Sequence, residues 1–320
     1  MVRKIALEEH FLAPGLIEHW EPTVAGIPEA VVTRLRRQLT DFDDERLQTM
    51  DQAGISRAIL SLAGPGVQAE PDAARAVRLA AAANDFLAAQ IARHPSRYGG
   101  FAHLPMQNPK AAADELERCV RQLGMQGAMI DGQTHGQYLD EPQFDVFWER
   151  VQALDAPIYL HPADPEREYA GFRGQPKLKR ATWEWTVETA THALRLVFAG
   201  TFEKFPGAKL ILGHLGETLP YLLWRFDSRV SVLYGLSEQM KHLPSFYIRR
   251  NIALTSSGMC SAEPLRCAID GMGAENVMFS VDYPFEDSET SRAFMDTTPL
   301  DEALRAQIAH GNAERLLKLT

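Results

Sequence analysis

The feature that most constrains the fold of this chain is its alternation of short apolar runs with longer amphipathic segments. The apolar runs have the length and composition of strands and lie at 4–10, 56–62, 97–104, 126–130, 157–161, 209–214, 251–256 and 276–282. Segments of helical periodicity lie between and after them, at about 43–53, 72–94, 110–123, 143–154, 184–203, 217–231, 262–271 and 301–318. Several strand-like runs are continuously apolar, as expected for strands that are buried on both faces. The pattern predicts an α/β fold, a closed parallel (β/α)8 TIM barrel.

An open, doubly wound sheet is the alternative, but no G-x-G-x-x-G motif follows the first strand-like run. A length of 320 residues fits one barrel with insertions, so we expect a single domain over 1–320. The segments 11–42 and 162–182 are longer than ordinary loops, and each follows a strand-like run. We expect both to be inserted loops at the mouth of the barrel, where the strands end.

Composition and charge exclude several classes of partner. A net charge of −9 argues against binding nucleic acid or an anionic membrane surface. No run of about 18 apolar residues is present, so no membrane span is expected. The few cysteines, Cys119, Cys260 and Cys267, form no C-x-x-C pair, which argues against a disulfide framework and a thiolate zinc site. No signal peptide is recognisable, and we expect a cytoplasmic protein.

Ligand-type side chains recur where the strand-like runs end. Glu8 and His10 are two residues apart, so their side chains point to the same face of a strand. His161, His214 and Asp282 end the fifth, sixth and eighth runs. All of these residues would lie at the carboxyl-terminal rim of a barrel, where active sites form. Carboxylate and imidazole groups together suit a divalent ion such as Mn2+ or Zn2+, so the sequence predicts a metal site at this rim.

Several motifs carry a resemblance that covers nearly the whole chain. They are KIALEEHF (4–11), LSLAGPGVQ (60–68), YLHP (159–162), ETATHALRL (188–196), FPGAKLILGHLGETLPYLLWRFD (205–227), SVDYPFE (280–286) and NAERLLKL (312–319). On these motifs the chain resembles the amidohydrolase superfamily. Within it, the chain is most similar to the branch of aminocarboxymuconate-semialdehyde decarboxylase and the non-oxidative benzoate decarboxylases, nearest to the members that act on γ-resorcylate (2,6-dihydroxybenzoate).

The resemblance implies roles for individual residues. It implies that Glu8, His10, His161 and Asp282 form the metal shell, with Mn2+ expected and Zn2+ as the alternative. His214 becomes a catalytic group, with Glu217 placed three residues on to orient its ring. Binuclear relatives use a lysine at the end of the fourth strand; here that run ends in Met129-Ile130-Asp131, so we expect one metal.

Substrate contacts are expected from Arg225, Phe285 and Trp183, with Phe11 as a further aromatic candidate. For Arg225 a surface salt bridge is the competing interpretation, and for the aromatic residues it is plain packing. His192 lies inside a helical run and is expected to pack in the core, whereas His135 lies in a polar loop and is expected to be solvated.

The implied activity is the decarboxylation of an ortho-hydroxylated benzoate, with a protonated Asp282 delivering a proton to the ring carbon that carries the carboxylate. The same site could instead hydrolyse a lactone, ester or amide, with Asp282 as base, or hydrate a dienoic acid. A barrel that binds a metal or an aromatic ligand without catalysis is the remaining alternative. The resemblance also implies a homodimer or homotetramer and a small aromatic carboxylic acid as substrate.

Overall fold

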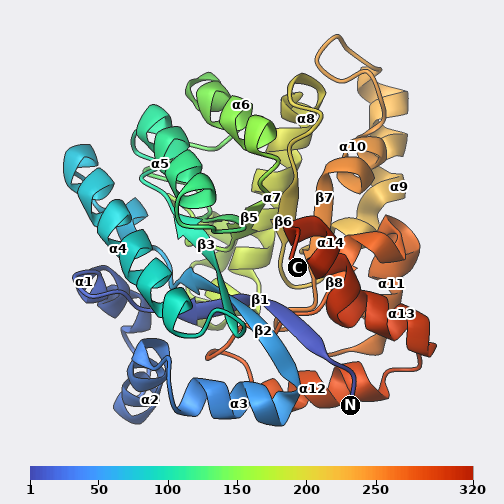
Figure 1. The fold of residues 1–320 in the computed structure, drawn as a ribbon. Coiled ribbons are helices and arrows are strands. Elements are labelled where there is room, and N and C mark those ends of the chain that lie inside the picture. Colours follow the sequence, from blue (N-terminus) through green and yellow to red (C-terminus); the bar gives the residue numbers. More distant parts are fainter. Residues whose placement is uncertain (320) are drawn as a thin grey trace.

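The computed structural model describes residues 1–319, and its centre is a parallel barrel of eight strands (Figure 1). Neighbouring strands pair in sequence order, and all of the pairings are parallel. The strands are β1 (Lys4–Phe11), β2 (Ile55–Leu62), β3 (Tyr98–His103), β4 (Gly127–Asp131), β5 (Ile158–His161), β6 (Leu210–Leu212), β7 (Ile252–Thr255) and β8 (Val277–Met278). The (β/α)8 prediction is confirmed.

Helices surround the barrel, as Figure 1 shows, and none of the described helices is long and apolar enough to cross a bilayer. The α-helices are α1 (Ile17–Trp20), α2 (Glu29–Thr40), α3 (Glu45–Ala53), α4 (Ala73–Arg93), α5 (Pro109–Arg121), α6 (Asp145–Leu154), α7 (Glu184–Phe198), α8 (Thr201–Lys204), α9 (Leu219–Arg229), α10 (Pro244–Asn251), α11 (Ala262–Met272), α12 (Ser288–Thr297), α13 (Glu302–Ala306) and α14 (Asn312–Leu317). Short 3-10 turns are η1 (Glu21–Val24), η2 (Gly66–Ala69), η3 (Pro142–Phe144), η4 (Ala170–Phe172), η5 (Pro176–Leu178), η6 (Arg180–Thr182) and η8 (Ala274–Asn276), and π-helical turns are η7 (Val230–Tyr234) and η9 (Gln307–Gly311).

The structure departs from the expected elements in four helices. The segment 11–42, expected as a loop, contains α1 and α2, and Val32, Leu35 and Leu39 of α2 recur at helical spacing and pack against Leu12 and Trp20. The sequence analysis missed this spacing. Helices α10 and α12 are also additional to the pattern. Helix α1 has 4 residues and α10 has 8, so each is too short for a clear periodicity.

Two apolar layers hold the barrel together. Its interior is filled by inward side chains from every strand, and α14 adds Ala313 and Leu317 to the same cluster. The second and larger layer lies between the strands and the surrounding helices. This arrangement leaves the carboxyl ends of the strands as the place where polar side chains can gather.

A β-bulge in β1 decides which of its residues face inward. Ala6 pairs with Ala58, but Glu9 pairs with Leu60, so β1 uses one residue more than β2 between these positions. Ile5 and Leu7 point into the barrel interior. The extra residue resets the alternation, so that Glu8 and His10 also face inward while Glu9 faces the outer side.

The hydroxyl group of Ser280 provides hydrogen-bond partners for the backbone of the bulge. Its oxygen accepts hydrogen bonds from the backbone N–H groups of Leu7 (3.0 Å) and Glu8 (2.7 Å), which lie where the bulge interrupts the regular ladder. The same hydroxyl donates to Glu9 Oε1 at 3.2 Å. A serine hydroxyl has one donor and two acceptor positions, and all are used here.

The barrel closes next to this bulge, between β1 and the segment after β8. Glu9 and Tyr283 form a parallel bridge, His10 N donates to Tyr283 O at 2.7 Å, and Asp282 N donates to Glu8 O at 3.0 Å. Arg46 of α3 lies against the closure, where it donates to His10 O at 2.6 Å and stacks over the Tyr283 ring. The closure therefore fixes the spacing between Glu8, His10 and Asp282.

We expect Ser280→Ala to lower the free energy of unfolding by roughly 2–4 kcal/mol, because two buried N–H groups lose their partner and Glu9 Oε1 keeps only the bond from Val281 N. Urea denaturation monitored by circular dichroism measures this change. Ser96→Ala, at an exposed position shortly before β3, is the control and should stay within about 0.5 kcal/mol of the wild type. Equal stability of the two variants would contradict the role assigned to Ser280.

Candidate metal centre

Four ligand-type side chains meet at the carboxyl-terminal rim of the barrel. One ligand atom from each lies within 4.8 Å of the others, and the residues are Glu8, His10, His161 and Asp282. The first two come from β1, the third ends β5, and the last lies four residues beyond β8. The structure therefore brings together the side chains that the sequence analysis proposed as metal ligands.

The donor atoms of this cluster face one another, and most of them have no hydrogen-bond partner among the described residues. Glu8 Oε1, His10 Nε2 and Asp282 Oδ1 are buried and have no hydrogen-bond partner within residues 1–319. His10 Nε2 lies 3.1 Å from Asp282 Oδ1, and His161 Nε2 lies 3.5 Å from Glu8 Oε1. Buried polar atoms without partners are costly, and a divalent cation among them would satisfy all of them at once. The residues present fit such an ion.

Local contacts fix the carboxylate of Glu8. Its Oε2 accepts a hydrogen bond from the hydroxyl of Tyr159, which also lies 2.8 Å from Thr255 Oγ1. A Cβ atom at Gly213 would lie 2.7 Å from Glu8 Oε2, so a glycine is required where β6 passes this carboxylate. Tyr159 is two residues before His161 and shares its inward face. Strand alternation could therefore have identified Tyr159, which the sequence analysis missed.

His214 lies beside the cluster and is held by Glu217. Its Nδ1 is 2.5 Å from Glu217 Oε1, while its Nε2 is 3.9 Å from Asp282 Oδ2 and 4.0 Å from Glu8 Oε1. His214, Glu217 and Asp282 all have positive φ angles, which are uncommon for residues other than glycine. Such backbone strain is found at functional sites, where surrounding contacts hold the conformation in place.

Charge interactions shift the protonation equilibria in the cluster. Burial disfavours charge on His161 and His214. Nevertheless, Asp131 and Glu8 raise the pKa of His161 to about 9, and Glu217 and Glu8 hold the pKa of His214 well above its usual value. Burial would also raise the pKa of Asp282, but contacts with His10 and His214 lower it to about 2. The carboxylates thus favour positive charge at the centre, whether from protons or from a metal ion.

Aromatic rings border the cluster on two sides. The Phe285 ring lies 5.5 Å from the His10 ring. Trp185 lies 6.5 Å from the His161 ring and donates to Asp164 Oδ1 at 2.7 Å. Trp183, which the sequence analysis named, is 44% exposed at the start of α7. Because residues two apart on a helix face different directions, only Trp185 turns toward the centre.

Other candidates lie away from the cluster. Arg225 is exposed on α9 and forms no ion pair within residues 1–319. Phe11 is buried on the outer side of β1 beside Phe42. His192 is fully buried, accepts a hydrogen bond from Leu139 N and packs in the core as expected, and His135 is exposed.

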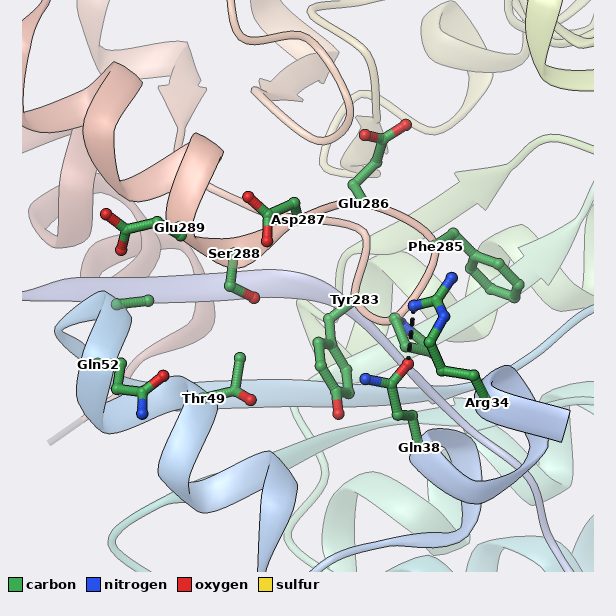
Figure 2. A pocket seen from close by; sticks show the side chains of 12 residues that line it. Arg34, Gln38, Thr49, Gln52, Tyr283, Phe285, Glu286, Asp287, Ser288 and Glu289 are labelled. Atoms are coloured by element: carbon green, nitrogen blue, oxygen red, sulfur yellow. Dashed lines mark hydrogen bonds between the residues drawn. The ribbon is translucent and has the colours of Figure 1, made fainter. Parts of the chain in front are cut away.

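A cavity of about 330 Å3 lies beside the segment that follows Asp282 (Figure 2). Tyr283 and Phe285 line it, together with Arg34 and Gln38 of α2, which are hydrogen-bonded to each other. None of the four clustered residues lines this cavity. It is therefore a separate feature on the outer side of the barrel closure.

Known proteins resemble this chain over nearly its whole length. The family model described as amidohydrolase matches residues 10–319. A γ-resorcylate decarboxylase from Polaromonas sp. is 43% identical over 99% of this chain and 98% of that protein.

Solved structures are similar over the whole chain. A 2,6-dihydroxybenzoate decarboxylase complexed with 2,6-dihydroxybenzoate has a TM-score of 0.94 at 41% identity, covering 100% of both chains. A dihydroxybenzoic acid decarboxylase from Polaromonas sp., with bound manganese and the inhibitor 2-nitroresorcinol, has a TM-score of 0.92 at 42% identity, covering 100% of this chain and 98% of that one.

We expect Glu8→Gln and His161→Asn each to weaken Mn2+ binding by at least roughly tenfold, because changes even beyond the direct ligands commonly cost 10- to 100-fold. Elemental analysis after dialysis against a fixed Mn2+ concentration measures the occupancy. His135→Asn, at an exposed position, should retain wild-type occupancy. Full occupancy in both cluster variants would show that these residues are not ligands.

Proposed function

The chain belongs to the amidohydrolase family, and we propose that it is a metal-dependent, non-oxidative decarboxylase of 2,6-dihydroxybenzoate (γ-resorcylate) or a closely similar ortho-hydroxylated benzoate. The reaction is that of a carboxy-lyase: a proton replaces the carboxylate on the ring, and CO2 leaves. The observation that carries the proposal is the cluster of Glu8, His10, His161 and Asp282 beside a histidine–glutamate pair. Similarity to decarboxylases over the full chain supports this reaction.

One divalent cation fits the cluster. Mn2+ is proposed because a related structure contains manganese, and Zn2+ is the alternative because carboxylate and imidazole ligands admit both ions. When bound, the ion supplies a Lewis acid and a template that orients the substrate oxygens.

Proton delivery is assigned to Asp282 and His214. The low pKa of Asp282 means that its carboxylate is ionised at rest, so a proton has to reach it before it can act as an acid. His214 holds a proton next to this carboxylate, because its raised pKa favours the protonated ring and its Nε2 lies 3.9 Å from Asp282 Oδ2. Glu217 holds the opposite ring nitrogen and so keeps Nε2 directed at Asp282. Asp282 then transfers the proton to the ring carbon that bears the carboxylate.

The aromatic substrate is proposed to lie between Phe285 and Trp185. Their rings flank His10 and His161, and aromatic walls favour a flat ligand through offset or edge-on contacts. Protonated His214 would stabilise negative charge on the substrate carboxylate or hydroxyl group. Substrate contacts of Arg225 and Trp183 stay proposals, and both side chains are exposed.

Hydrolysis of a lactone, ester or amide is the alternative reaction for the same residues. The similarity to decarboxylases, including one complexed with 2,6-dihydroxybenzoate, favours decarboxylation. A substrate screen separates the two, since only decarboxylation releases CO2.

We expect the Mn2+-loaded protein to convert 2,6-dihydroxybenzoate to 1,3-dihydroxybenzene and CO2. Asp282→Asn should lower kcat by roughly 100-fold or more, since loss of a general acid typically costs 100- to 10,000-fold. Chromatography of the phenol product and CO2 detection measure turnover, and Asp270→Asn, exposed on α11, is the control. Near-wild-type turnover in Asp282→Asn would contradict the proton-donor role, and hydrolysis without CO2 release would contradict the decarboxylase proposal.

Assembly into a homodimer or homotetramer is also proposed. The end of α9 and the η7 turn expose a group of large apolar side chains, namely Tyr221, Trp224, Val232, Leu233, Tyr234 and Leu236. Tyr221, Trp224 and Tyr234 are each about 80% exposed. Apolar groups of this kind commonly mark protein–protein contacts. A second copy of the chain is proposed to cover this surface, which also includes Arg225.

We expect sedimentation velocity to show a species larger than one chain. Trp224→Glu should shift the population toward monomer, because it places a charge in the apolar contact. Val146→Glu, which changes an exposed apolar residue on α6, is the matched control and should keep the wild-type distribution. A wild-type monomer at micromolar concentration would contradict the proposed assembly.

A further inference from the structure

The carboxylate of Asp131 is buried behind the cluster and is not explained by the roles above. Asp131 ends β4, is 1% exposed, and neither of its carboxylate oxygens has a hydrogen-bond partner within residues 1–319. Its Oδ1 lies 3.1 Å from Nδ1 of His161, on the side of that ring opposite to Glu8. A buried carboxylate is costly without a partner, so its position requires a compensating interaction.

Strand register places Asp131 between two histidines. β3, β4 and β5 end in His103, Asp131 and His161, and Asp131 pairs directly with His161 in the sheet. His103 Nε2 accepts a hydrogen bond from Val67 N at 2.9 Å, and burial lowers the pKa of His103. The neutral ring therefore carries its proton on Nδ1, which lies 4.0 Å from Asp131 Oδ2. The carboxylate thus has a ring nitrogen on each side.

The segment 60–68, singled out in the sequence for its LSLAGPGVQ motif, holds Asp131 in place. The side chain of Gln68 forms two hydrogen bonds with the backbone of Asp131. Its Oε1 accepts from Asp131 N at 2.8 Å, and its Nε2 donates to Asp131 O at 3.0 Å. Gly64 leaves room for the carboxylate, because a Cβ atom there would lie 2.6 Å from Asp131 Oδ1. Backbone and side chain are therefore both fixed relative to His161.

We propose that Asp131 is a positioning residue that accepts a hydrogen bond from the Nδ1–H group of His161 and so presents Nε2, without a proton, to the metal ion. A carboxylate in this place fixes the tautomer and orientation of a histidine ligand and makes it more basic. The inference rests on the metal site of the proposed function. It assigns to Asp131, Gly64 and Gln68 a supporting role for metal affinity.

The first test is Mn2+ binding to the purified, metal-free protein, measured by competition with a fluorescent chelator. Asp131→Asn should weaken binding by roughly 10- to 100-fold, because the amide keeps the shape but loses the charge. The electron paramagnetic resonance spectrum of Mn2+ at saturation should also change, because the His161 ring is free to reorient. Asp270→Asn should match the wild type in both measurements.

The second test moves the carboxylate without altering any charge. Gly64→Ala forces the Asp131 side chain away from His161, and it should weaken Mn2+ binding in the same direction. Combined with Asp131→Asn, it should add little further loss, because both changes remove one interaction. Circular dichroism and thermal unfolding of the metal-free variants show whether each one folds.

The outcomes separate this inference from the metal site itself. If the wild-type chain does not bind Mn2+ or Zn2+, the metal site of the proposed function is wrong. If the wild type binds Mn2+ and folded Asp131→Asn binds it within twofold, with an unchanged spectrum, Asp131 has no positioning role. Fully additive losses in the double variant would also overturn the inference, because the two changes would then act independently.

Discussion

The hydrogen bonds between Ser280 and the bulged backbone of β1 are the contacts on which the geometry of the site depends. They hold an extra residue in the first strand, and that residue turns Glu8 and His10 inward. A regular strand would continue the alternation of Ile5 and Leu7 and would turn Glu9 inward instead. Because Ser280 lies just before Asp282, one short segment both shapes the first strand and contributes the last member of the cluster.

Carboxylates and imidazoles alternate throughout the site. His161 lies between Asp131 and Glu8, and His214 lies between Glu217 and Asp282. Each ring therefore has one nitrogen toward an outer carboxylate and the other toward the centre. This arrangement fixes ring orientation through the outer partner and leaves the inner nitrogen directed at the centre. The proposed metal binding and the proposed proton delivery therefore both depend on a carboxylate that holds the outer nitrogen of a histidine ring.

Much of the fold and of the cluster could be predicted from the sequence, because eight apolar runs gave the strands and polar residues stood at their ends. The spacing of Glu8 and His10 correctly placed both on one face. It could not reveal the bulge, since that depends on Ser280, which is distant in the sequence. The sequence analysis named Trp183 and not Trp185, because the rotation of α7 is set by the turn before it and cannot be read from the spacing of the residues. Asp131 was overlooked because a single carboxylate at a strand end is informative only when its neighbours across the sheet are known.

The bulge also affects how β1 tolerates changes in length. Deletion of Leu7 would remove the extra residue and leave a regular strand. In that strand Ile5, Glu8 and His10 would occupy alternate positions, so all three would still face inward. Losing Glu9 would place the side chains of Glu8 and His10 on opposite faces. The loss of one residue before Glu8 is therefore compatible with the site, whereas a one-residue change between Glu8 and His10 is not. When chains of this architecture are aligned, a one-residue gap belongs ahead of this pair and never within it.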